Sequence, residues 1–298
     1  MRRVVAVVGP TAVGKTRLSI ELASALTGEI VNLDAYQVYR GMDIGTAKAS
    51  AAELAAIRHH LVDVFDISHD ANVVEFEAMA AAAIADIQTR GSLPICVGGS
   101  GMYVRAVLDQ LEVPPTDPAV RAKYERLLDE VGPAELHARL AAVDSEAAAN
   151  IVVGNSRRVV RALEVVELTG SFTARLPEPE PRYEDVRIGL RVPRELLAVR
   201  IEQRVRGMFA AGWVDEVRAL VAHGLLETRT ASKAIGYRQV AAVAAGELDL
   251  EQAVAEISAA TLRFSRRQLK WFQRDRRVQW LDFDDPALVE RAVALAAG

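Results

Sequence analysis

The chain has 298 residues, of which 51% are hydrophobic and 26% charged, a composition typical of a soluble protein with a substantial core. Its 36 basic residues are slightly outnumbered by 40 acidic ones, which excludes a globally basic nucleic-acid coat but allows a local basic patch. The single cysteine, Cys96, excludes an intrachain disulfide and fits the reducing cytoplasm. Because no apolar run approaches the roughly 18–20 residues that a membrane helix needs, we expect no membrane contact.

The first third of the sequence alternates between predicted strands and predicted helices. Apolar runs predict strands over residues 3–8, 30–33, 60–65 and 93–97. Apolar positions at helical spacing predict helices over 17–26, 74–89 and 103–109. This alternation indicates an α/β fold with a parallel sheet flanked by helices.

The character of the sequence changes after residue 112, where Pro114, Pro115 and Pro118 follow in close succession. Every periodic segment from there to about residue 170 is typical of a helix. A strand over 186–192, a long helix over 194–222, a helical segment over 230–277 and an edge strand over 278–281 follow. We therefore predict a core in two parts, 1–112 and 186–298, split by an all-helical insertion over 113–185.

Residues 9–16 read GPTAVGKT and match the phosphate-loop pattern G-x-x-x-x-G-K-[ST] between a predicted strand and a predicted helix. Such a loop directs backbone N–H groups and a helix N-terminus at phosphate oxygens. Lys15 supplies a cation, and the Thr16 hydroxyl is a candidate ligand of Mg²⁺. Because the loop holds any diphosphate, it does not by itself indicate ATP hydrolysis. The predicted diphosphate-binding residues are Gly9, Pro10, Thr11, Ala12, Val13, Gly14, Lys15 and Thr16.

Asp34 and Ser100 follow two other predicted strands, at the edge of the sheet where ligands of open α/β folds lie. Asp34 could accept a proton, hold Mg²⁺ through water, or cap the loop that follows. The glycines of residues 98–101 either leave space for a ligand or mark the entry to a helix. A motor or switch NTPase would usually carry an acidic residue there, so the glycines favour small-molecule kinases and other diphosphate chemistry.

Residues 261–277 form a local basic patch, with seven Lys or Arg against one acidic residue, Asp275. Phe264, Trp271 and Phe272 lie among these charges, so the segment suits phosphates and stacked rings, with a solvated helix face as the alternative. Smaller basic clusters lie at 157–161 and 233–238. Three separated basic clusters and one phosphate pocket favour a folded RNA over a small metabolite.

Over essentially the whole chain, these residues resemble the tRNA dimethylallyltransferases (tRNA isopentenyltransferases). The resemblance is carried by GPTAVGKT at 9–16, DAYQ at 34–37, VYRGMDIGTAK at 38–48, HHL at 59–61, VGGSGMY at 97–103, RALE at 161–164, AIGY at 234–237 and RRQLKWF at 266–272. The run at 41–48 is much more specific than the phosphate loop.

A few positions depart from the pattern of that family. Leu33 and Ala35 flank Asp34, where a small residue, often Ser, is common on each side. Ser100 replaces the usual Thr and keeps the hydroxyl. Leu262 replaces a frequent Arg, which puts one phosphate contact of the basic segment in doubt. None of these changes removes a group that the chemistry requires.

The resemblance implies transfer of a dimethylallyl group from dimethylallyl diphosphate to N6 of the adenosine on the 3′ side of the anticodon. It implies that Asp34 is the general base, and that Lys15 and Mg²⁺ on Thr16 hold the diphosphate. It adds Ser100 and an arginine of the 200–206 segment, Arg200 or Arg204, of which we assign Arg204, to stabilise the leaving diphosphate. Apolar walls would exclude water.

The implied partner is the anticodon stem-loop of tRNA, with the reacting base extruded from its stack. The insertion would grip the stem-loop, and the 261–277 segment would follow its backbone. No protein partner is implied, and the family suggests a cytoplasmic monomer. The implied tRNA contacts are Asp34, Ala35, Tyr36, Gln37, Ser100, Arg121, Arg157, Arg158, Val159, Val160, Arg161, Lys233, Gly236, Tyr237, Arg238, Arg266, Arg267 and Lys270.

Three other functions are compatible with part of this pattern. A small-molecule kinase explains Lys15, Asp34 and the glycines but not the insertion or the basic clusters. Prenyl transfer to free adenine nucleotides would not need so extended a basic surface. An RNA-binding NTPase switch predicts an acidic Mg²⁺ ligand at a strand end, which the sequence lacks at residues 98–101.

Overall fold

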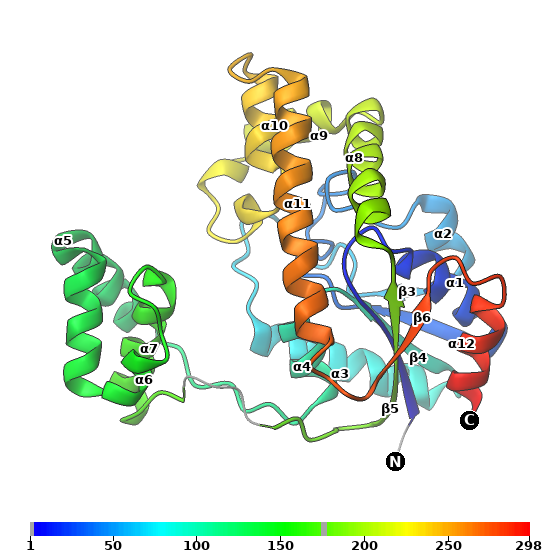
Figure 1. The fold of residues 1–298 in the computed structure, drawn as a ribbon, viewed down its shortest axis with the longest axis horizontal. Coiled ribbons are helices and arrows are strands. Elements are labelled where there is room, and N and C mark those ends of the chain that lie inside the picture. Colours follow the sequence, from blue (N-terminus) through cyan, green and yellow to red (C-terminus); the bar gives the residue numbers. More distant parts are fainter. Residues whose placement is uncertain (1–2, 174–177) are drawn as a thin grey trace. The chain divides into compact units, whose positions relative to one another are not determined.

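The computed structural model describes residues 3–173 and 178–298 (Figure 1). Residues 1–2 and 174–177, which the sequence analysis assigned to the core and to the insertion, lie outside this description. The chain divides into two compact units, Met1–Gln110 with Pro181–Gly298, and Leu111–Glu180. The smaller unit ends earlier than the expected 113–185, because a strand that begins at Glu184 pairs with Arg3 of the larger unit.

The larger unit is built on a six-stranded parallel sheet with strand order β3-β2-β4-β1-β5-β6. Residues 4–8 of the central β1 are almost fully buried, as expected for a parallel strand covered on both faces. Val8 pairs with Gly98 of β4 and with Gly189 of β5, so the loops that follow β1 and β4 begin side by side. The strands are β1 (Arg3–Val8), β2 (Gly28–Asn32), β3 (His59–His60), β4 (Leu93–Gly98), β5 (Glu184–Arg191) and β6 (Val278–Asp282).

Helices cover both faces of this sheet (Figure 1). On one side α1 (Lys15–Leu26) contacts α12 (Leu288–Ala297), and on the other α3 (Val73–Thr89) contacts α4 (Gly101–Leu108). A short helix, α2 (Ala51–Ala56), follows the loop after β2. The structure confirms the predicted parallel sheet flanked by helices. It differs at β3, which has two residues where a strand over 60–65 was predicted; Phe65 forms only an isolated bridge with Tyr39.

Four helices stand beyond the carboxyl ends of the strands (Figure 1). They are α8 (Arg194–Ala210), α9 (Trp213–Ala222), α10 (Tyr237–Ala244) and α11 (Leu250–Phe272), with two 3₁₀ turns, η1 (Leu225–Glu227) and η2 (Ala231–Lys233), between α9 and α10. The prediction of one helix over 194–222 is wrong. Gly212, with φ 96°, ends the first helical path and caps α9, and a left-handed turn of this kind favours glycine.

The smaller unit contains α5 (Pro118–Val143), α6 (Ser145–Ala149) and α7 (Ser156–Thr169). Asp117 caps α5 and Pro118 opens it, while Gly132, with φ 77°, and Pro133 kink it. The unit has its own apolar core, which includes Leu136, Leu140, Ala147, Val159 and Leu163. Its described part is therefore helical and packs as an independent cluster.

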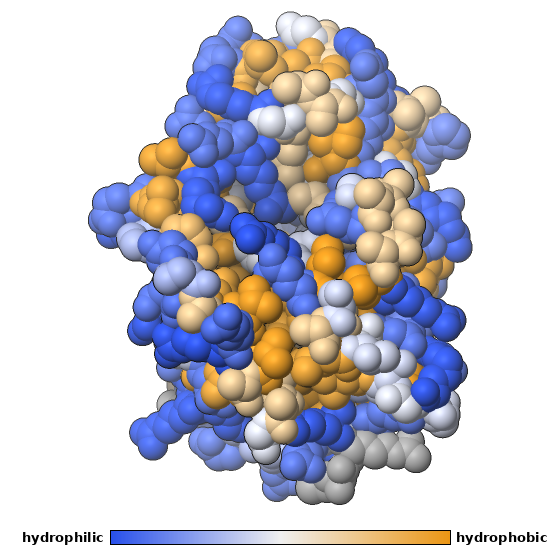
Figure 2. Space-filling model, turned by 90° about the vertical axis from the view of Figure 1, so that its right-hand side faces the viewer, coloured by the Kyte–Doolittle hydropathy of each residue, from blue (hydrophilic) through white to orange (hydrophobic). Residues whose placement is uncertain are grey.

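Figure 2 shows the side of the molecule that carries α1 and α12, where apolar side chains lie in patches interrupted by charged ones. Among the residues that the structure describes, none of the helices is both long enough and apolar enough to cross a membrane.

Candidate active site

The phosphate loop turns sharply between β1 and α1. Gly9 has φ 136°, Ala12 has φ 65° and Gly14, the residue that caps α1, has φ 104°, so glycines supply two of the three positive-φ conformations of the loop. No side chain caps the start of α1. The first N–H groups of α1 therefore stay available for an anion at its N-terminus.

Lys15 lies at the first position of α1, and its Nζ donates a hydrogen bond of 2.6 Å to the Pro10 carbonyl. Burial and the nearby Arg204 charge lower the pKa of Lys15 to about 7, although Asp34 acts in the opposite direction. A bound anion would stabilise the charged form of this lysine, because the anion would compensate for the hydration that the ammonium group has lost. This environment makes the loop a candidate functional site.

Asp34, just beyond β2, holds its carboxylate in a fixed orientation. Its Oδ1 accepts backbone hydrogen bonds from Tyr36 (2.8 Å) and Gln37 (3.3 Å), while its own N–H donates to Asn32 Oδ1 (3.1 Å). The buried Asn32 in turn donates to the Leu61 carbonyl. Within the described residues Oδ2 accepts no hydrogen bond, so one carboxylate oxygen caps the turn and the other stays available for a ligand.

Two arginines of α8 reach toward the loop in different ways. Arg200 Nε donates to the Ala12 carbonyl (2.9 Å), and its guanidinium lies 5.0 Å from the centre of the Phe283 ring. Arg204 donates no hydrogen bond to any described residue, and burial lowers its pKa while the Asp34 charge opposes that shift. Arg200 is thus engaged in holding the loop, and Arg204 is the arginine available to an anion.

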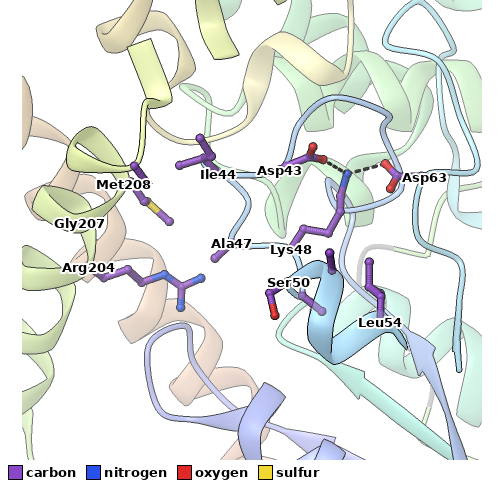
Figure 3. A pocket seen from close by; sticks show the side chains of 13 residues that line it. Asp43, Ile44, Ala47, Lys48, Ser50, Leu54, Asp63, Arg204, Gly207 and Met208 are labelled. Carbon is purple, nitrogen blue, oxygen red and sulfur yellow. Dashed lines mark hydrogen bonds and ion pairs between the residues drawn. The ribbon is translucent and has the colours of Figure 1, made fainter. Parts of the chain in front are cut away.

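Arg204 also lines a pocket of about 550 Å³ (Figure 3). In Figure 3 its side chain and that of Met208 extend from α8 toward the loop that carries Ile44 and Ala47. The charge of Arg204 acts on both Lys15 and Asp34, which connects this pocket to the phosphate loop. The lining residues are Asp43, Ile44, Ala47, Lys48, Ala49, Ser50, Ala51, Leu54, Asp63, Arg204, Gly207, Met208 and Ala211.

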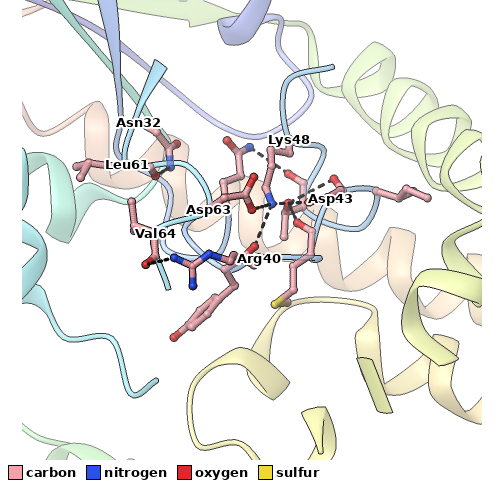
Figure 4. Close-up of polar contacts among 12 residues, drawn as sticks. Asn32, Arg40, Asp43, Lys48, Leu61, Asp63 and Val64 are labelled. Atoms are coloured by element: carbon pink, nitrogen blue, oxygen red, sulfur yellow. Dashed lines mark hydrogen bonds and ion pairs between the residues drawn. The ribbon is translucent and has the colours of Figure 1, made fainter. Parts of the chain in front are cut away.

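The loop over residues 38–48 is held in place from inside by Lys48 (Figure 4). Its Nζ lies 2.5 Å from Oδ1 of Asp43 and from Oδ1 of Asp63, and donates to the Tyr39 carbonyl (2.9 Å). The Lys48 side chain is only 4% exposed, whereas Asp43 and Asp63 are 58% and 42% exposed, so a buried ammonium group is paired with two carboxylates that stay in contact with water. The specific run at 41–48 therefore has a structural task at the wall of the pocket.

Glu216 of α9 fixes the same loop from outside, and the sequence analysis did not identify it. Its carboxylate accepts the N–H groups of Asp43 (2.9 Å), Ile44 (2.5 Å) and Gly45 (3.2 Å), and also the Tyr237 hydroxyl (2.8 Å). One carboxylate therefore accepts three hydrogen bonds from the loop and a fourth from the Tyr237 hydroxyl. A lone glutamate on a helix, 171–173 residues from its partners, gives no local sequence signal.

The glycines at 98–101 make room for protein groups. A Cβ on Gly98 would lie 2.7 Å from Leu33, one on Gly99 2.3 Å from Gln268, and one on Gly101 2.1 Å from Trp271. The ligand-space interpretation of these three glycines is therefore wrong, because Leu33, which follows β2, and side chains of α11 fill the space. Ser100 between them is half-buried and caps α4 without a side-chain hydrogen bond.

The basic segment has an exposed face and an inner face. Six of its cations are exposed: Arg263, Arg266, Arg267, Lys270, Arg274 and Arg276. Among the described residues, none of these six forms an ion pair with an acidic residue. Arg277 is different, because it pairs with Asp109 and Asp275 in a network centred on the buried Arg187. Six of the seven cations thus remain available to a polyanion.

Two of the predicted tRNA contacts at 233–238 are interior residues. Tyr237 and Gly236 are buried against Trp213, whose ring lies 2.3 Å from where a Gly236 Cβ would be. Their prediction as contacts is not supported, because α9 covers them. Lys233 and Arg238 on either side are exposed. Near Asp34, Ala35 and Tyr36 are partly exposed, while Gln37 Nε2 donates to the Thr46 carbonyl (3.1 Å) and the Ala47 carbonyl (3.3 Å) of the pocket loop.

The smaller unit contains a buried carboxylate, Glu164, that binds two of the predicted contact arginines. Arg121 and Arg161 lie 2.7 and 2.9 Å from its Oε2. Burial alone would raise the pKa of Glu164, but hydrogen bonds from Thr116, these arginines and the Asp117 N–H lower it to about 2. Val159 and Val160 are buried in the core of this unit, so their side chains cannot be contacts, whereas Arg157 and Arg158 are exposed.

No group of three or more His, Cys, Asp or Glu in the described part of the chain could hold a metal ion by itself. Thr16 is exposed at the first turn of α1, beside the open N-terminus. One hydroxyl, substrate phosphates and water suit Mg²⁺, which keeps several waters and needs few protein ligands. The residues present therefore fit a metal that arrives with a diphosphate.

The fold and the site together define an α/β protein with a phosphate-binding loop, an anchored carboxylate and a free arginine at one edge of a parallel sheet. The family model of the IPP transferases matches residues 37–275. The chain belongs to the IPP transferase family and is a transferase. The resemblance predicted from the sequence is thereby confirmed.

Similar proteins extend over nearly the whole chain. A tRNA dimethylallyltransferase of Nocardioides sp. is 56% identical over 298 residues, which cover 99% of this chain and 96% of that protein. One from Salinispora arenicola is 55% identical and covers 99% of this chain and 87% of its own length. The solved full-length tRNA isopentenylpyrophosphate transferase of Bacillus halodurans is 39% identical with a TM-score of 0.74, and the alignment covers 100% of this chain and 96% of that chain.

Proposed function

We propose that this chain transfers a dimethylallyl group from dimethylallyl diphosphate to N6 of the adenosine on the 3′ side of the anticodon in tRNA. The observation that carries the proposal is the position of Arg204, which lines the pocket and lies close enough to Lys15 of the phosphate loop and to the anchored Asp34 for their charges to interact. Full-length relatives named tRNA dimethylallyltransferase support it.

The donor diphosphate would lie on the phosphate loop, at the open start of α1. Lys15 and Arg204 would neutralise the negative charge that gathers on the diphosphate as its bond to the prenyl carbon breaks. Both cations are partly buried, so they interact with an anion more strongly than fully exposed cations do. Ser100, close to the loop at the start of α4, is the further hydroxyl that we assign to this site.

Thr16 is the residue that would hold Mg²⁺, which when bound would add positive charge to the diphosphate. Lys15, Arg204 and the N–H groups at the start of α1 would act on the diphosphate with or without the metal. Thr16 contributes from the first turn of α1, where the helix dipole also favours the anion.

Asp34 is suited to remove the proton from N6. The amino group is a weak nucleophile because its lone pair is delocalised into the adenine ring. As the N6–C bond forms and the C–O bond of the donor breaks, the N6 proton would pass to the oxygen of Asp34 that carries no backbone hydrogen bond. The prenyl carbon would thus exchange its bond to the diphosphate oxygen for a bond to N6, and the proton would remain on Asp34.

The pocket wall has the character that an allylic donor requires. Ile44, Ala47 and Met208 provide apolar surface next to Arg204 (Figure 3). Excluding water from this space would prevent hydrolysis of a diphosphate that ionises readily.

The anticodon stem-loop would be bound by exposed cations, with the reacting base extruded. Arg266, Arg267 and Lys270 of α11 supply one basic surface, and Lys233 and Arg238 a second. Arg157 and Arg158 with the partly exposed Arg121 and Arg161 supply a third in the smaller unit. Side chains that are buried, Val159, Val160 and Tyr237, are not part of this proposal.

The experiment is transfer of labelled dimethylallyl diphosphate to an unmodified tRNA with Mg²⁺, with AMP and ATP as competing acceptors. Label on the tRNA alone supports the proposal. Label on AMP or ATP would move the activity to free nucleotides. ATP consumption without prenyl transfer would favour a kinase or a switch and contradict the assignment of Asp34.

A further inference from the structure

Gln268 lies on the inner face of α11 and connects two loops that are far apart in the sequence. Its Oε1 accepts the Thr11 N–H of the phosphate loop at 3.0 Å, and its Nε2 donates to the Gly99 carbonyl after β4 at 2.9 Å. The side chain is 6% exposed. One amide therefore ties the ends of two neighbouring strands to a helix more than 160 residues away.

The environment at position 268 suits a side-chain amide and few other groups. One terminal atom must accept a hydrogen bond and the other must donate one, which Glu, Lys and Met cannot do. Gly99 leaves the space, because a Cβ there would lie 2.3 Å from Nε2. Gly101 lets Trp271 approach on the next turn of α11, because a Cβ at position 101 would lie only 2.1 Å from Trp271 Nε1.

Gln268 completes a set of three side chains that hold three successive residues of the phosphate loop. Lys15 binds the Pro10 carbonyl, Gln268 the Thr11 N–H, and Arg200 the Ala12 carbonyl. The Thr11 N–H is thus engaged by Gln268 in this structure. Loss of the Gln268 amide would leave this part-buried N–H and the buried Gly99 carbonyl without these partners.

We propose that Gln268 is a positioning residue for the diphosphate site, acting through the phosphate loop without touching the substrate. This inference rests on the proposed function, because it takes a diphosphate as the ligand of the loop. It assigns α11 two roles on opposite faces: the outer face presents Arg266, Arg267 and Lys270, and the inner face sets the loop geometry.

The test compares Gln268→Glu with the charge-matched control Gln273→Glu, an exposed position at the end of the same helix. Inorganic pyrophosphate with Mg²⁺ is titrated into each protein by calorimetry in the absence of RNA. Steady-state kinetics then give kcat and the KM for dimethylallyl diphosphate. RNA affinity and melting temperature are measured on the same samples.

For Gln268→Glu we expect about a tenfold weaker affinity for pyrophosphate and a similar rise in donor KM, since the acidic side chain repels the Gly99 carbonyl. RNA affinity should match that of the control within twofold. Gln268→Asn, which keeps both functions on a shorter stem, should recover part of the loss. If Gln268→Glu fails to fold, Gly99→Ala displaces the amide from the other side and should show the same loss of pyrophosphate affinity.

Wild-type pyrophosphate affinity in a Gln268→Glu protein with a lowered melting temperature would overturn the inference and leave Gln268 a packing residue. Absence of pyrophosphate binding by the wild-type protein would also overturn it. Pyrophosphate binding that depends on Gln268 in a protein that prenylates no RNA would sustain the inference while the proposed function fails.

Discussion

The lowered pKa of Lys15 makes a quantitative prediction about donor binding. With a pKa of about 7 in the free protein, the ammonium group is largely deprotonated at pH 8. A diphosphate beside Nζ favours the charged form and returns the pKa toward its ordinary value. Binding at pH 8 should therefore take up about 0.9 of a proton at Lys15, and binding at pH 6 only about 0.1. The affinity should fall as the pH rises above 7.

The assay is calorimetric titration of pyrophosphate with Mg²⁺ at pH 6 and pH 8, each in two buffers of different ionisation enthalpy. The slope of the observed enthalpy against that ionisation enthalpy gives the protons taken up. The ligand titrates in the same range, so the same series with Lys15→Arg, whose guanidinium stays charged, is subtracted. Equal proton uptake by the wild-type protein and Lys15→Arg at pH 8 would refute the assignment of Lys15 to the diphosphate.

Three further predictions follow from the contacts of other residues. Asp34→Asn should lower kcat at least about 100-fold, because the amide cannot take the N6 proton, while RNA affinity in a filter-binding assay stays within a few fold; equal loss of both would make Asp34 a recognition residue. Glu216→Ala should lower the melting temperature and raise the donor KM, because three N–H groups of the pocket loop lose their acceptor; an unchanged KM would separate this loop from the donor pocket. Charge reversal at Arg267 and Lys270 should weaken tRNA binding and flatten its dependence on salt concentration; a wild-type slope would identify this helix face as merely solvated.

Much of the fold could be predicted because its signals are local. The buried run of β1, the phosphate loop and the start of α1 form one continuous pattern. The structure has β1 at the predicted residues 3–8 and begins α1 at Lys15, two residues before the predicted start. The end of a helix has a weaker signal in the local sequence. Helical periodicity continues on both sides of Gly212, so the break between α8 and α9 was missed, and the predictions also lacked α12.

The site was predictable only where its residues follow strands. Asp34 follows β2, and the phosphate loop that leads to Lys15 follows β1, so a parallel topology brings both to one edge of the sheet. Glu216 and Gln268 reach their partners across 171–173 and 169–257 residues, and no pattern around them indicates which backbone groups they bind. For the same reason the sequence could not separate the exposed Arg238 from the buried Tyr237 beside it, since only the packing of Trp213 distinguishes them.

The most direct test of the account follows both halves of the donor at once. Dimethylallyl diphosphate labelled with ¹⁴C in the prenyl group and ³²P in the diphosphate is incubated with unmodified tRNA and the wild-type protein. Prenyl transfer to N6 should place ¹⁴C on the RNA, recovered as N6-dimethylallyladenosine after digestion, and release an equal amount of ³²P as free diphosphate. Phosphorus label on the RNA or on a nucleotide, or diphosphate released without prenyl on the RNA, would contradict it.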